Sequence, residues 1–78
     1  MARFFFNLVG SETVYDSEGT ELSSLEAARC EAIEDARAIM SDAIRAGFDV
    51  SERRVEICDE SGDVVAVMPF ANAVSRRF

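Results

Sequence analysis

One long amphipathic helix constrains this chain more than any other feature. Apolar side chains recur at three- and four-residue spacing between Ser23 and Gly47, and the acids of this stretch fall on the opposite side. Gly47 is expected to end the helix as the residue after the C-cap. Ser23 and Ser24 are equally good N-caps, so the start stays open. The apolar stripe comprises Leu25, Ala28, Ala32, Ile33, Ala36, Ile39, Met40 and Ala43.

The residues before the helix form a predicted β-hairpin. Arg3–Val9 is rich in phenylalanine, Gly10-Ser11 is a turn signal, and Glu12–Asp16 returns as a second strand. A four-residue loop is the alternative to this two-residue loop. Asp16–Gly19 is a predicted turn. In the two-residue register, the side chains that face the helix are Phe4, Phe6, Leu8 and Tyr15.

The residues after the helix form a second predicted hairpin. Its strands are Arg53–Asp59 and Asp63–Met68, joined by a three-residue loop with Gly62 in the left-handed conformation. Pro69 ends the second strand or marks a sheet edge. If Asp59 opposes Asp63, the residues that face the helix are Val55, Ile57, Val65 and Val67.

These elements predict an α+β fold. The order is ββαββ, a two-layer sandwich with one helix on a four-stranded, mainly antiparallel sheet whose strand order stays open. The 78 residues are long enough for one domain, expected over residues 1–70, with residues 71–78 as a C-terminal tail that is briefly helical around residues 71–74.

Charge and cysteine content exclude several function classes. Fifteen acids and eight bases give a net charge of −7, which argues against nucleic-acid binding. No signal-peptide pattern follows Met1 and no apolar run reaches membrane-spanning length, so we expect a cytoplasmic protein without membrane contact. Cys30 and Cys58 are then expected to be free thiols, and without histidine they are too few ligands for zinc.

The sequence contains no motif that carries chemistry. Phosphate-binding loops, dinucleotide-binding glycines and nucleophile elbows are absent. Asp16, Glu18 and Glu21 lack the spacing of a calcium loop and are typical of a turn. Arg53-Arg54 and Arg76-Arg77 favour ion pairs over anion binding. We therefore expect a non-enzymatic protein with no metal, cofactor or small-molecule ligand.

Two geometric arguments predict self-association. The sheet face away from the helix is too apolar to be purely solvated. The helix, at ~33 Å, also exceeds strands of ~20–24 Å, so its C-terminal end should receive the tail or a second subunit. The predicted interaction surface comprises Phe5, Val14, Met40, Ile44, Phe48, Arg54, Ala66 and Met68.

Four motifs together resemble a family of short bacterial proteins known only as a domain of unknown function. They are Phe4-Phe5-Phe6-Asn7-Leu8, the turn Asp16-Ser17-Glu18-Gly19-Thr20-Glu21-Leu22, the helix start Leu25-Glu26-Ala27-Ala28-Arg29, and the hairpin Val55-Glu56-Ile57-Cys58-Asp59-Glu60-Ser61-Gly62. The resemblance extends to about Met68. It implies a small stand-alone cytosolic protein and carries over no functional residues.

These features favour two functions. The first is a protein-interaction module that acts as a homodimer. The alternative is an antitoxin-like or regulatory binder of a basic protein, suggested by the charge of −7 and by the acidic helix face. A weaker similarity to the antitoxins of bacterial toxin–antitoxin pairs, which pack an acidic helix on a sheet, points the same way.

Overall fold

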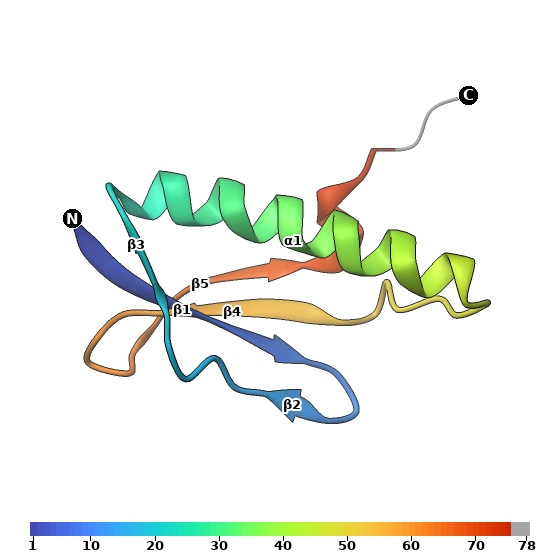
Figure 1. Cartoon of the computed structure of the whole chain (residues 1–78), viewed down its shortest axis with the longest axis horizontal. Helices are drawn as coiled ribbons and strands as arrows, with labels where there is room; N and C mark the ends of the chain where they lie inside the picture. Colours follow the sequence, from blue (N-terminus) through green and yellow to red (C-terminus); the bar gives the residue numbers. More distant parts are fainter. Residues whose placement is uncertain (76–78) are drawn as a thin grey trace.

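The computed structural model describes residues 1–75 and has an α+β fold. Figure 1 shows one long helix along one side of an open antiparallel sheet. Arg76, Arg77 and Phe78 of the predicted tail lie outside the described residues. The elements are β1 (Ala2–Val9), β2 (Thr13–Val14), β3 (Thr20–Leu22), α1 (Leu25–Arg45), β4 (Arg54–Cys58), β5 (Val64–Pro69) and the 3₁₀ helix η1 (Phe70–Ala73).

The sheet has five strands where the sequence predicted four. Its order is β2-β1-β4-β5, and β3 also pairs with β1, so β2 and β3 share one edge of the long first strand. Pairing with β1 stops after Val14 and resumes only at Thr20. The predicted second strand, Glu12–Asp16, is therefore shortened to β2, and β3 follows as a separate strand. The described arrangement is therefore βββαββ, not ββαββ.

The first hairpin is one residue out of the predicted register. Val9 pairs with Thr13 across a three-residue loop, so Leu8 pairs with Val14. A one-residue slip moves side chains to the opposite face of a strand. The prediction that Tyr15 lies in the core is therefore wrong, since its side chain is 75% exposed.

The second hairpin has the predicted loop and a different register beyond it. Asp59 donates its backbone N–H to the Asp63 oxygen at 3.0 Å, and Gly62 has the predicted positive φ of 86°. Cys58 then pairs with Val64 and Ile57 with Ala66, so Val65 is an extra residue in β5. This bulge turns Ala66 and Met68 toward α1, and Val67, which was predicted to lie in the core, is 48% exposed.

Helix α1 follows the predicted pattern closely. The Ser24 side chain accepts the Ala27 N–H at 3.1 Å and is the N-cap, and Gly47 has a φ of 91° just after the C-cap. Each residue of the predicted stripe is buried or packs against the core. The fully buried small side chains Ala28, Ala32 and Ala36 allow the helix to approach the sheet closely. Helix α1, the one α-helix of residues 1–75, could not cross a lipid bilayer because charged residues recur along the helix.

The chain after β5 continues into the core. Phe70 is fully buried, and its N–H bonds the Arg53 oxygen at 2.9 Å. Ala73 is 2% exposed, and its oxygen accepts a 2.7 Å hydrogen bond from Arg37 Nε of α1. The packed part of the chain therefore reaches Ala73 and holds η1 against the second half of α1.

Candidate functional site

A groove lies beside the C-terminal half of α1. Its volume is about 550 Å³, and its apolar walls are Met40 and Ile44 of α1, Val50 of the following loop, and Val74 just after η1. Val50 is buried and forms the floor, whereas Ile44 and Val74 are 69% and 57% exposed. We call this feature the helix-end groove. Apolar surface of this kind is uncommon on a protein that meets only water.

Local interactions hold the walls of the helix-end groove in place. The bond from Arg37 to the Ala73 oxygen fixes η1 against α1 and so positions Val74. On the other side, Phe48 donates its N–H to the Ala43 oxygen at 2.8 Å, which closes the chain over the end of the helix. The Phe48 ring is 67% exposed and does not line the groove, although the next residue, Asp49, does.

The charges along the groove differ from those of the chain as a whole. Arg37 and Arg45 contribute two positive charges and Asp49 one negative charge, which gives the lining a net charge of +1. The whole chain carries −7. The Ser51 N–H bonds the Asp49 carboxylate at 2.9 Å and, with the Ser51 hydroxyl, lowers the pKa of Asp49, so this acid is ionised at neutral pH.

The structure divides the predicted interaction surface. Ile44, Phe48 and Val14 are exposed, and the first two lie at or beside the groove. Met40 is buried but contributes to the groove wall. Ala66 and Met68 lie on the α1 side of the sheet, where Met68 is buried and Ala66 partly buried, because the bulge at Val65 reverses their side of the sheet.

The sheet face away from α1 carries polar as well as apolar side chains. Arg54 and Glu56 form an ion pair of 3.2 Å on the central strand β4. Phe5 is half-buried beside Cys58, which is itself buried and accepts a 3.6 Å hydrogen bond from Asn7. Burial raises the pKa of the Cys58 thiol, and the neighbouring acids raise it further, so the reactive thiolate is disfavoured.

The Asp16 carboxylate bridges the broken edge of the sheet. The sequence predicts only a turn for this residue. Asp16 Oδ2 accepts the Phe6 N–H at 3.1 Å, where neither β2 nor β3 pairs with β1. Asp16 Oδ1 accepts the N–H groups of Glu18 and Gly19 at 3.1 and 3.0 Å. The Asp16 N–H in turn bonds Asn7 Oδ1 at 2.9 Å. Burial raises the pKa of Asp16, but the three backbone donors together outweigh burial, so the pKa is lowered.

Gly19 completes this turn by its lack of a side chain. Its φ is 72°, and a Cβ there would lie 2.9 Å from Arg3 Cγ and from Phe5 Cε1, and 3.0 Å from the Phe4 oxygen. Both the backbone conformation and the close approach therefore require glycine.

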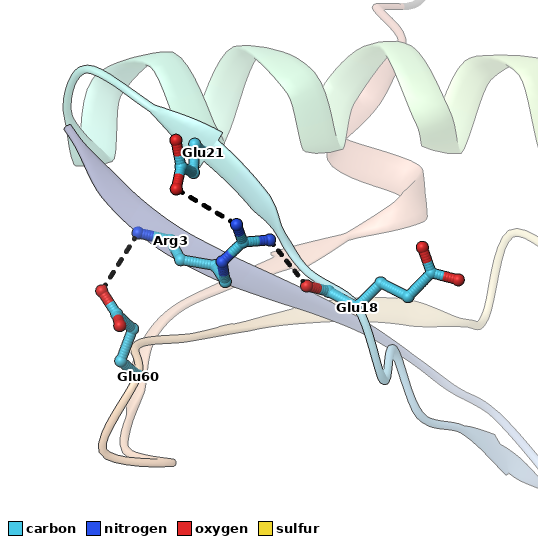
Figure 2. A network of polar contacts seen from close by, with 4 residues as sticks. All are labelled: Arg3, Glu18, Glu21 and Glu60. Atoms are coloured by element: carbon cyan, nitrogen blue, oxygen red, sulfur yellow. Dashed lines mark hydrogen bonds and ion pairs between the residues drawn. The ribbon is translucent and has the colours of Figure 1, made fainter.

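Arg3 fastens the same turn from the first strand. In Figure 2 its guanidinium lies between β1 and β3 and donates to the Glu18 oxygen at 2.8 Å and to Glu21 Oε1 at 3.1 Å. Its backbone N–H also reaches Glu60 of the β4–β5 loop at 3.4 Å. Both side chains of the ion pair are substantially exposed, so its contribution to stability is small.

Metal-ligating side chains do not cluster within residues 1–75. No group of three or more histidine, cysteine or acidic side chains there could hold an ion. The acids of the first turn have separate structural tasks: Asp16 caps the turn and Glu21 pairs with Arg3.

Comparison with known proteins identifies the family. The family model for a domain of unknown function, DUF6894, matches residues 3–71. The chain belongs to the DUF6894 family. The resemblance inferred from the sequence motifs is therefore confirmed. No curated protein and no solved structure matches the chain.

The DUF6894 motifs of this chain have a structural meaning. Asn7 of the aromatic strand motif and Asp16 and Gly19 of the turn motif meet at the broken sheet edge. Their hydrogen bonds hold this edge of the fold together. The helix-end groove extends beyond the family match, since Val74 follows its last residue.

Proposed function

We propose that this DUF6894 protein is a non-enzymatic protein-interaction module that acts as a homodimer in the cytosol. One observation carries the proposal: Ile44 and Val74, each more than half exposed, line one apolar groove, and Phe48, which directly precedes the lining residue Asp49 in the chain, is 67% exposed. Such a cluster is typical of a surface that another protein covers.

The burial available at this surface suits a reversible dimer. Each large side chain gains ~1.5–3 kcal/mol on complete burial, so side chains already one-third buried would gain ~1–2 kcal/mol. Three from each copy together would gain ~6–12 kcal/mol. Association costs roughly 4–15 kcal/mol in lost motion, so even the most favourable combination leaves ~8 kcal/mol, which corresponds to micromolar rather than nanomolar affinity.

Charge also favours this surface for contact between copies. Two chains of −7 repel each other over most of their surfaces. The lining of the helix-end groove carries both signs, with Arg37, Arg45 and Asp49 close together. Two copies that meet there avoid most of the repulsion and can form ion pairs across the interface.

Sedimentation equilibrium tests the dimer directly. Between about 1 and 200 μM, the weight-average mass should rise from 8.6 kDa toward twice that value. Ile44→Gln should weaken the association, whereas Val64→Gln, at another exposed apolar residue, should not. A mass of 8.6 kDa across the whole range would refute the proposal.

A second candidate function has support in the acidic surface of α1. Glu26, Glu34 and Asp42 are exposed on the helix and make no ion pair with other residues of 1–75. Together with the charge of −7, these free carboxylates suit an antitoxin-like or regulatory binder of a basic protein.

Affinity capture from the native lysate at low salt tests this second function. It should recover a basic partner that Glu34→Gln with Asp42→Asn no longer retains. Recovery of no partner, or equal capture by the double variant, would count against it.

A further inference from the structure

The helix-end groove is open to solvent. Its walls come from α1, the α1–β4 loop and the segment after η1, yet no side chain of residues 1–75 occupies its volume of about 550 Å³. Protein interiors and stable interfaces are closely packed, so an apolar hollow of this size accommodates at least one large side chain from elsewhere.

A suitable side chain directly precedes a lining residue of the groove, since Phe48 is followed by Asp49. Phe48 follows Gly47, whose φ of 91° turns the chain sharply at the end of the helix. The bond from its N–H to the Ala43 oxygen holds the Phe48 backbone in place. The ring is 67% exposed and does not line its own groove. The chain therefore presents an aromatic projection next to an apolar hollow.

We propose that the groove of each copy receives Phe48 of a second copy, reciprocally about a two-fold axis. This inference rests on the proposed homodimer and names the residue that completes its interface. A two-fold arrangement uses the same patch on both copies and closes after two subunits, so a projection and a hollow side by side satisfy each other twice.

Charge complementarity favours a second copy as the occupant. Asp49 follows Phe48 directly, so insertion of the ring carries this ionised acid to the rim of the other groove. Arg37 and Arg45 stand on that rim. The two-fold axis repeats the pairing, and each copy supplies both an acid and its arginine partners.

The other surfaces are less suited to this contact. The free edge of β5 is interrupted by the bulge at Val65 and ends at Pro69, two features that obstruct edge-to-edge pairing. The outer sheet face carries the ion pair between Arg54 and Glu56 in its central strand. The helix-end groove combines apolar area with balanced charge.

Two complementary variants test the insertion. Phe48→Ser removes the projection and leaves the groove open. Ser41→Phe places a ring in the groove from an exposed helical position on its wall and leaves Phe48 intact. Each variant alone should raise the dimer dissociation constant at least about tenfold, because both insertions are lost. Circular dichroism confirms that each variant folds.

Mixing the two variants gives the decisive measurement. In a heterodimer, Phe48 of the Ser41→Phe chain enters the open groove of the Phe48→Ser chain, so one of the two insertions returns. The equimolar mixture should therefore associate more tightly than either variant alone. A mixture that associates no better than its components, although the wild-type chain dimerises, would overturn the insertion and leave the homodimer standing.

Isotope-filtered NMR of the wild-type dimer gives an answer that needs no variant. In mixed labelled and unlabelled protein, nuclear Overhauser contacts should join the Phe48 ring of one copy to the methyl groups of Met40 and Val74 of the other. Their absence in a proven dimer refutes the insertion, and a wild-type chain that stays monomeric refutes both proposals. If the wild-type chain stays monomeric and a decanoate probe shifts the same methyl groups, the occupant is an acidic amphiphile instead.

Discussion

Loss of the Asp16 carboxylate should destabilise the fold strongly. Asp16→Ala removes the acceptor of three backbone N–H groups, those of Phe6, Glu18 and Gly19. The last two resemble the donors at a helix N-cap, where such a loss costs roughly 0.5–2 kcal/mol. The Phe6 group is partly buried between β2 and β3, and leaving it unpaired costs ~1–3 kcal/mol.

The expected total is ~2–4 kcal/mol, a large share of the stability of a small domain. It corresponds to a fall in melting temperature of ~10–25 °C. Urea unfolding followed by circular dichroism at pH 7 measures the loss, with Ser17→Ala as the control at an exposed neighbouring residue. If the free energy of unfolding of Asp16→Ala lies within ~0.5 kcal/mol of that of this control, the carboxylate does not bridge the sheet edge.

The same interaction predicts a pH dependence with a defined sign. The folded-state pKa of Asp16 is lowered below its ordinary value of 3.8. Its stabilisation is therefore fully present above that ordinary value and is lost as the pH falls through the folded-state pKa. The free energies of unfolding of the wild-type chain and of Asp16→Asn should therefore become more similar in strong acid, where Asp16 is protonated. A difference that stays constant between pH 7 and pH 2 would contradict this account.

Four further substitutions test the packing and the charges of the fold. Gly19→Ala should lower the free energy of unfolding by ~2–4 kcal/mol, because Gly19 combines a positive φ with close contacts. Gly62→Ala has open space around it and should lower the free energy of unfolding by only ~1 kcal/mol. Equal melting temperatures of the two variants would contradict the close approach at Gly19. Burial, with a smaller contribution from neighbouring Glu34, raises the pKa of Asp35, so stability is lost as the pH rises through that pKa. Asp35→Asn should therefore raise the unfolding free energy at pH 7 and leave it unchanged near pH 3; a loss at both values would contradict this. Ala32→Leu should destabilise by ~1–3 kcal/mol in urea unfolding, since Ala32 is fully buried against the sheet; an unchanged midpoint would show spare room there.

Periodic and local signals were sufficient to predict the helix and the second loop. The stripe from Leu25 to Ala43, the stop at Gly47 and the left-handed Gly62 depend on contacts within a few residues, which sequence pattern captures well. The sequence also indicated that the helix overhangs the sheet. This overhang pointed to Ile44, which lines the helix-end groove, and to Phe48, which is exposed and directly precedes the lining residue Asp49.

Strand register could not be predicted in the same way. The slip that exposes Tyr15 and the bulge at Val65 each depend on how two distant segments pack against α1. Both pairings satisfy the local turn rules, and a change of one residue reverses every side chain beyond it. For this reason Ala66 and Met68 were assigned to the wrong face.

The amino-acid sequence alone determined the α+β class, the family, and a helix with one apolar face, because these follow from composition, motifs and spacing along the chain. Only the tertiary structure decided that Asp16 replaces a missing stretch of edge strand and that the segment after Pro69 forms one wall of a groove. Both features join residues far apart in the chain, and their hydrogen bonds and packing exist only once the sheet and helix have come together.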